Sequence, residues 1–256
     1  SEKVEGLEAD NISVSSDASL SGLATTDASA DAATTAGAAT ANALSTGING
    51  ADFAGSTVGI GGIGSLAGQA NFSNTATSSN VSLASSATAS NDSGNGLIGG
   101  LSINVASDAT LTGMAIGSLG ADASSTAGTA TANAGQSDSA VGAVLPSLTV
   151  GGIGNITGAA QLDTSADALS VSGISTADAG LGQTVTGLNA ADIDVASDAS
   201  LTAQSFSNLD ASATSTAGLA SADAGDQSSM VTGLASNLDL DLSLIHISEP
   251  TRQVLI

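Results

Sequence analysis

The chain has 256 residues, of which 24 are acidic and two are basic, and its formal net charge is −22. This charge argues against nucleic acid and anionic membranes as partners, since both require clustered Lys and Arg. There is no Cys, Trp or Tyr. The sequence therefore lacks most acid–base and nucleophilic side chains, and we expect neither catalytic residues nor a cofactor. No apolar run approaches the roughly 20 residues of a membrane span.

Composition alone is also compatible with disorder. Leu, Ile, Val and Phe make up about a fifth of the chain, a level at which highly charged chains remain unfolded. Ser, Ala, Gly and Thr fill most of the rest, as in low-complexity linkers. The spacing of the large residues argues against disorder, because it is regular.

Residues 1–11 form a flank, and residues 12–237 repeat about every 45 residues. The repeat predicts five copies, at 12–57, 58–102, 103–147, 148–192 and 193–237, in which equivalent apolar residues form ladders. The ladders are Ile12, Val58, Ile103, Leu148 and Ile193; Val14, Ile60, Val105, Val150 and Val195; and Leu20, Leu66, Leu111, Ile156 and Leu201.

Within a copy, every second residue from Ile12 to Ala24 is small or apolar, and the residues between are mostly Ser or Asp. Such period-two alternation predicts a half-buried strand of some 13 residues. A second alternating stretch, with a face of mostly Ala, starts near Thr34. A Gly-containing connector from Ser45 predicts a turn or a short third strand.

A period of about 90 residues overlies the shorter one. Odd copies carry a Ser-Asp or Ala-Ser-Asp stretch where even copies carry Gly-Gly-Ile-Gly. Outward-facing Asp17, Asp108 and Asp198 thus alternate with Ile63 and Ile153. If copies stack about 4.8 Å apart, these carboxylates lie about 10 Å from one another, roughly a Debye length.

These patterns predict an all-β, elongated repeat protein, a β-solenoid of about five coils of about 45 residues each. The alternative is a series of antiparallel β-hairpin or sandwich modules, one per 45 or 90 residues. Disorder, or order only on assembly, is a third possibility.

Asp192, Asp194 and Asp198 are the candidate metal ligands, because hard carboxylate oxygens suit Ca²⁺. The Gly-Gly-Ile-Gly stretches resemble the calcium-binding nonapeptide of repeats-in-toxin proteins, but Ile156 and Leu66 occupy its acidic position. Exposed Asp on strands and turns is commonly solvated surface. We therefore expect no metal site, with a calcium-dependent adhesin repeat as an alternative.

An ice-binding β-solenoid is a further alternative, which would need ranked Thr residues. Thr-x-Thr pairs occur along the chain but do not share a register. The four pairs considered for such an array are Thr75/Thr77, Thr129/Thr131, Thr184/Thr186 and Thr214/Thr216.

Residues 242–256 begin with LSLIHISEPTR, which resembles the translation of a transposase sequencing adapter. We expect this tail to be non-native, and residues 238–241 to be the start of a truncated further segment. The chain begins at Ser1 rather than Met, so we also expect its N-terminus to be missing or processed.

Residues 12–237, poor in Lys and Cys and rich in Ala, Gly, Ser, Thr and Asp, resemble the β-strand-repeat segments of large bacterial surface and secreted proteins. These include adhesins, autotransporter passengers and filament subunits. The resemblance implies a non-catalytic extracellular stalk or scaffold that self-associates or binds an unidentified surface ligand. A self-assembling extracellular fibre subunit is the alternative.

Overall fold

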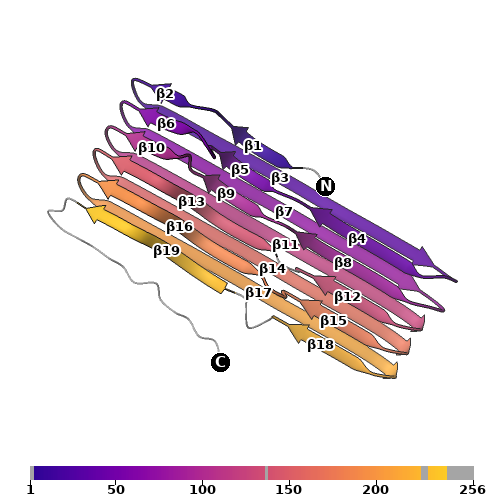
Figure 1. The fold of residues 1–256 in the computed structure, drawn as a ribbon. Coiled ribbons are helices and arrows are strands. Elements are labelled where there is room, and N and C mark those ends of the chain that lie inside the picture. Colours follow the sequence, from indigo (N-terminus) through magenta and orange to yellow (C-terminus); the bar gives the residue numbers. More distant parts are fainter. Residues whose placement is uncertain (1–2, 136–137, 226–229, 241–256) are drawn as a thin grey trace.

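The computed structural model describes residues 3–135, 138–225 and 230–240, and these residues form strands and turns without any helix (Figure 1). The strands build three parallel sheets, A, B and C. The prediction of a repeat-like, all-β structure is confirmed. The expected non-native tail at 242–256 lies outside the described residues.

Sheets B and C each take one strand from every copy, and the strand order follows the order of the copies. Sheet B contains β3 (Ala18–Thr34), β7 (Gly64–Asn80), β11 (Ala109–Ala127), β14 (Gly154–Ser172) and β17 (Ala199–Ala217). Sheet C contains β4 (Ala39–Ser45), β8 (Ser85–Asn91), β12 (Ala130–Ala134), β15 (Ser175–Ala179) and β18 (Ala220–Ala224).

Sheet A has nine strands, because the early copies contribute two short strands each and the later copies one longer strand. It contains β1 (Val4–Glu8), β2 (Ile12–Val14), β5 (Ile48–Asp52), β6 (Thr57–Ile60), β9 (Gly94–Ile98), β10 (Ser102–Val105), β13 (Ser139–Val150), β16 (Thr184–Val195) and β19 (Met230–Leu240). Strand β13 pairs with β9 along its first half and with β10 along its second half.

Neighbouring strands are related by a shift of 45 or 46 residues in all three sheets, except that β1 and β5 of sheet A are related by 44 residues. In sheet B, Leu20 stands opposite Leu66, and Leu66 stands opposite Leu111. In sheet A, Ile12 stands opposite Val58, which stands opposite Ile103. The residues of each ladder therefore lie side by side in adjacent strands.

The predicted fold class is wrong in two respects. All strand pairs of the described residues are parallel, which overturns the antiparallel hairpin or sandwich alternative. The elongated β-solenoid is also incorrect, because the strands form three sheets, one of them curled, rather than a clear solenoid. Sheet B strands of 17 to 19 residues span roughly 55 to 65 Å, whereas five stacked strands reach only about 25 Å. The result is a plate, broadest along its strands (Figure 1).

The single strand predicted from Ile12 to Ala24 is in fact two strands on different sheets. Strand β2 ends at Val14 in sheet A, and β3 starts at Ala18 in sheet B. The three residues between them turn the chain without changing its parity. Alternation therefore continues through the turn, and Ile12 and Leu20 pack against the same core from opposite sheets.

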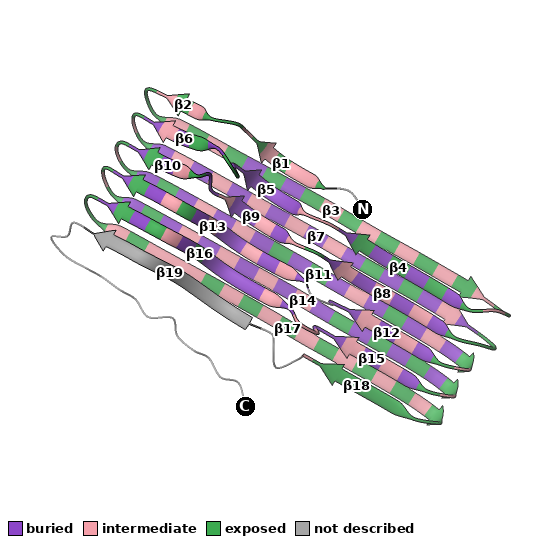
Figure 2. Ribbon diagram, in the orientation of Figure 1, coloured by how far each residue is buried: buried purple, intermediate pink, exposed green. Residues whose placement is uncertain are grey.

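Two apolar clusters lie behind sheet B. One is mostly Ala and packs sheet C and the start of sheet A against the distal half of sheet B. The other contains the aliphatic ladders of sheets A and B, with Leu66 and Ile103 completely buried. Figure 2 shows that buried residues alternate with intermediate or exposed residues along the central strands of sheet B, β7, β11 and β14.

Glycines let the backbones of sheets A and B touch. A Cβ atom on Gly113 of β11 would overlap the carbonyl oxygen of Gly142 on β13, and one on Gly142 would overlap the backbone of Ala159 on β14. Equivalent contacts recur in the other copies, for example between Gly22 and Gly50. The two layers are therefore held closer than any side chain would allow.

The 90-residue period has a physical basis in the turns from sheet A to sheet B. The Asp17 carboxylate accepts a hydrogen bond from the backbone N–H of Ile63 at 2.8 Å, and Asp108 accepts one from Ile153 at 2.8 Å. A Cβ atom on Gly62 would overlap the Asp17 carboxylate. An Asp in one copy thus requires a Gly in the next.

Candidate functional site

The three candidate metal ligands lie on two different elements. Asp192 and Asp194 are exposed on the outward face of β16, and Asp198 is exposed in the turn that precedes β17. The backbone oxygen of Asp198 accepts a hydrogen bond from the N–H of Gly154. Within the described parts of the chain, no group of three or more His, Cys, Asp or Glu side chains is placed to hold a metal ion.

Carboxylates in the turns from sheet A to sheet B occur only in every second copy. On the sheet faces, by contrast, some carboxylates lie on adjacent strands. Asp122 stands opposite Asp167 in sheet B, and Asp178 stands opposite Asp223 in sheet C. Partial burial and the neighbouring Asp167 charge raise the pKa of Asp122. Burial and the Asp223 charge likewise raise the pKa of Asp178. These neighbours repel one another and mark the outer faces as acidic.

A row of buried polar side chains lies where sheet C passes into sheet A, next to Asn74 on β7 of sheet B. We call these side chains the polar seam, which consists of Ser45, Asn74, Asn91, Asp138 and Gln183. The Asn74 amide donates to the Ser45 hydroxyl at 2.7 Å, and the Ser45 hydroxyl donates to Asn91 Oδ1 at 2.8 Å. The backbone N–H of Asn91 donates to Asp138 Oδ1. These hydrogen bonds link the first copy of the repeat to the second, and the second copy to the third.

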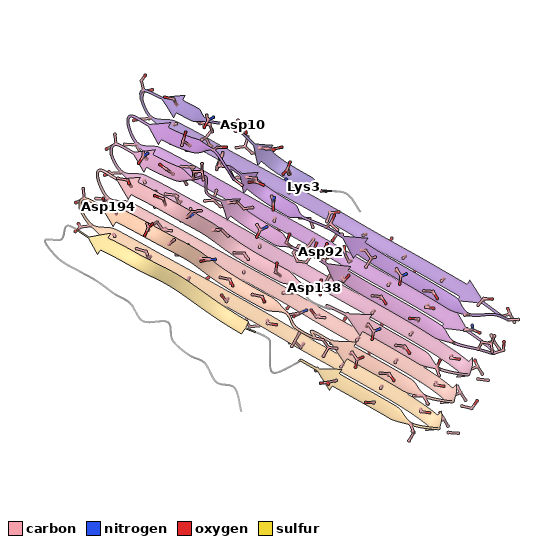
Figure 3. All side chains as sticks on the ribbon, viewed as in Figure 1. Lys3, Asp10, Asp92, Asp138 and Asp194 are labelled. Atoms are coloured by element: carbon pink, nitrogen blue, oxygen red, sulfur yellow. The ribbon has the colours of Figure 1, made fainter. Side chains whose placement is uncertain are left out.

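Asp138 is the one carboxylate of the seam, and its position is labelled in Figure 3. Its side chain is 1% exposed, and its Oδ2 atom has no hydrogen-bond partner. Burial raises the pKa of Asp138 to about 7, opposed by the hydrogen bond from Asn91 and assisted by the charge of Asp92. A carboxyl group of this kind exchanges a proton near neutral pH.

Gln183 occupies the equivalent position one copy further on. Its amide donates to the Thr164 hydroxyl at 2.5 Å, while its Oε1 has no partner. The seam was not predicted from the sequence, although a signal was present. Asp92, Asp138 and Gln183 are spaced by 46 and 45 residues, so they form a polar ladder in the same register as the apolar ones.

The four Thr-x-Thr pairs do not form one array. Thr75 and Thr77 lie on β7 of sheet B, and Thr184 and Thr186 lie on β16 of sheet A. Thr131 lies on β12 of sheet C, and Thr214 lies near the end of β17. The pairs therefore belong to three sheets, which gives no support to the ice-binding alternative.

Lys3 is the sole basic residue of the described chain, and its ammonium group pairs with Glu5 and lies 3.8 Å from Asp52 Oδ2. The remaining described carboxylates are thus not matched by basic side chains. Apart from Lys3, every charged side chain of the described residues is acidic.

Comparison with protein-family models, curated proteins and solved structures gives no match to this chain. A search of the described residues for a helix long and apolar enough to cross a membrane found none.

Proposed function

We propose that the chain is a non-catalytic scaffold segment of a bacterial surface protein, with an extracellular location. The observation that carries this proposal is the unbroken parallel register of the five sheet B strands, with sheets A and B in backbone contact. Each copy pairs with the next on three sheets, so the plate resists bending between copies.

The shape favours a scaffold over a stalk. One copy of about 45 residues adds only about 4.8 Å along the stack, whereas its sheet B strand spans roughly 60 Å across it. Each copy therefore adds little length to the molecule for the number of residues that it contains. It is suited to presenting a broad, stiff, acidic surface, whose charge opposes nonspecific aggregation.

Antibodies raised against the folded chain test the proposal on cells of the source organism. We expect them to label intact cells, and we expect protease treatment of intact cells to remove the signal. Labelling that requires permeabilised cells would overturn the extracellular location.

A self-assembling fibre subunit is the second candidate, favoured by the edge strands. Strands β3 and β4 end sheets B and C on one side, and β17 and β18 end them on the other. Such edges can template pairing with another chain. Electron microscopy and fibre diffraction of concentrated protein test this candidate, which predicts filaments with a repeat of about 4.8 Å along their axis. Protein without filaments at high concentration would exclude it.

A further inference from the structure

The two narrow sides of the plate differ in charge. We define the turn rim as the five turns from sheet B to sheet C together with the strand residues that directly precede three of them, at residues 35–38, 81–84, 126–129, 171–174 and 216–219. None of these 20 residues is charged. The opposite side, formed by the turns from sheet A to sheet B, carries the carboxylates of Asp17, Asp108 and Asp198.

The turn rim is also rich in exposed apolar side chains. Its exposed members are Val81, Leu83, Val171, Ile174 and Leu219. The backbone N–H of Ala130 donates to Ile174, and that of Ser175 donates to Leu219, so Ile174 and Leu219 are neighbours in one column. Clustered apolar side chains on a soluble surface commonly mark an interaction site.

We propose that the turn rim is a surface for lateral self-association, on which two copies of this chain meet rim to rim. An uncharged apolar strip on an otherwise acidic molecule is complementary to the same strip of a second copy. A second copy also carries a net charge of −22, so contact between acidic faces is opposed by repulsion. Rim-to-rim contact is opposed less, because the nearest carboxylates, such as Asp122 and Asp178, lie four residues, or about 13 Å, from the rim.

The expected contact is symmetric and weak. An isologous pair buries the same strip on both partners, and five turns give a strip only about 25 Å long. An interface this narrow falls in the class of transient contacts. Its strength grows with the number of stacked copies, since each copy adds one turn. This inference is independent of the proposed extracellular location.

Sedimentation velocity of the full chain over a wide concentration range tests the proposal. We expect a monomer–dimer equilibrium that strengthens with salt, because salt screens the net charge of both partners. The variant Leu83→Asp with Ile174→Asp is expected to weaken association at least tenfold. Circular dichroism checks that this variant remains folded.

The opposite side of the plate provides a matched control, Ile63→Asp with Ile153→Asp. The replaced side chains come from the same copies, have similar exposure (52% and 41%, against 53% and 46%) and add the same charge. We expect this control to associate as the unmodified chain does. A monomer at all concentrations, equal weakening in both variants, or association that the rim variant leaves intact would each overturn the proposal.

Discussion

The glycines between sheets A and B are the residues with the least freedom to change. Gly142→Ala is expected to destabilise the protein by roughly 1–3 kcal/mol or more, because its Cβ would meet backbone atoms that cannot move aside. Gly120, on the outward face of β11, has room for a methyl group, since the atom nearest to an added Cβ would be Ser165 Oγ at 3.6 Å. Thermal unfolding should show Gly120→Ala unchanged or slightly stabilised. Equal losses in both variants would show that the layers are not in contact at Gly142.

Side-chain direction alternates sharply along β11. Leu111 is 1% exposed, whereas Thr110 and Thr112 are on the outward parity. Leu111→Asp should unfold the protein or lower its stability by several kcal/mol, since it places a carboxylate among Leu66 and Ile156. Thr110→Asp and Thr112→Asp should be nearly silent in the same denaturant titration. Similar effects at the three positions would contradict the strand assignment.

Asp138 should make stability depend on pH in a specific direction. Its pKa is raised from 3.8 to about 7 on folding, so the folded state binds more protons than the unfolded state between these values. The free energy of unfolding therefore falls as pH rises from about 4 to 7, by an amount of the order of a few kcal/mol, and is level above pH 7.

The variant Asp138→Asn isolates this contribution from that of the other carboxylates. Chemical denaturation at pH 5 and pH 8 is expected to show a smaller decrease for the variant, and higher stability than the unmodified chain at pH 8. Identical pH profiles would mean that Asp138 is solvated and ionised as an ordinary carboxylate.

Strand β16 carries two of the three candidate calcium ligands. Asp192 and Asp194 share its outward face, but Asp198 lies about 13 Å further along the chain, so one strand cannot bring all three to an ion. We expect Ca²⁺ and Mg²⁺ to raise the melting temperature equally, by screening. Stoichiometric Ca²⁺ binding in calorimetry that is lost on Asp192→Asn with Asp194→Asn would contradict this and support the calcium-dependent adhesin alternative.

The strands were more predictable than their grouping into sheets. Period-two alternation finds the first part of β3, as far as Ala24, because its inward residues are more buried than the residues between them, but it misses the continuation of β3 to Thr34. It cannot find the turn at residues 15–17, whose length preserves parity. It also fails in sheet A, where adjacent residues such as Gly142 and Ala143 are both buried and the alternation is interrupted.

The candidate sites were less predictable than the strands, for a related reason. Exposed Asp residues stand out in a sequence, and Asp192 was noticed for that reason. Asp138 differs from them only through its burial, which depends on Ser45, Asn74 and Asn91 from other copies. The proximity of turn-rim side chains such as Ile174 and Leu219 also becomes visible only when the turns of different copies are aligned.

For the whole molecule, the stacking of copies predicts a gradient of stability. Strands β7, β11 and β14 have a neighbour on each side in sheet B, whereas β3 and β17 are its edges. Backbone hydrogen bonds at the edges open by local fraying, and central ones require larger openings. Hydrogen exchange followed by mass spectrometry should show at least tenfold slower exchange in β11 than in β17. Uniform exchange across the five strands would indicate that the plate unfolds as one unit.

The pairing of Asp turns with glycine turns has a genetic consequence. Two odd copies in succession would set a carboxylate against a side chain where Asp17 now meets Gly62, and two even copies would leave the N–H group equivalent to that of Ile63 without its acceptor. Recombination that removes or inserts a single copy of about 45 residues therefore creates a mismatched junction. An array of this type can gain or lose copies without a mismatched turn only in steps of two. The pair of copies, about 90 residues long, is therefore the unit that recombination can duplicate or delete.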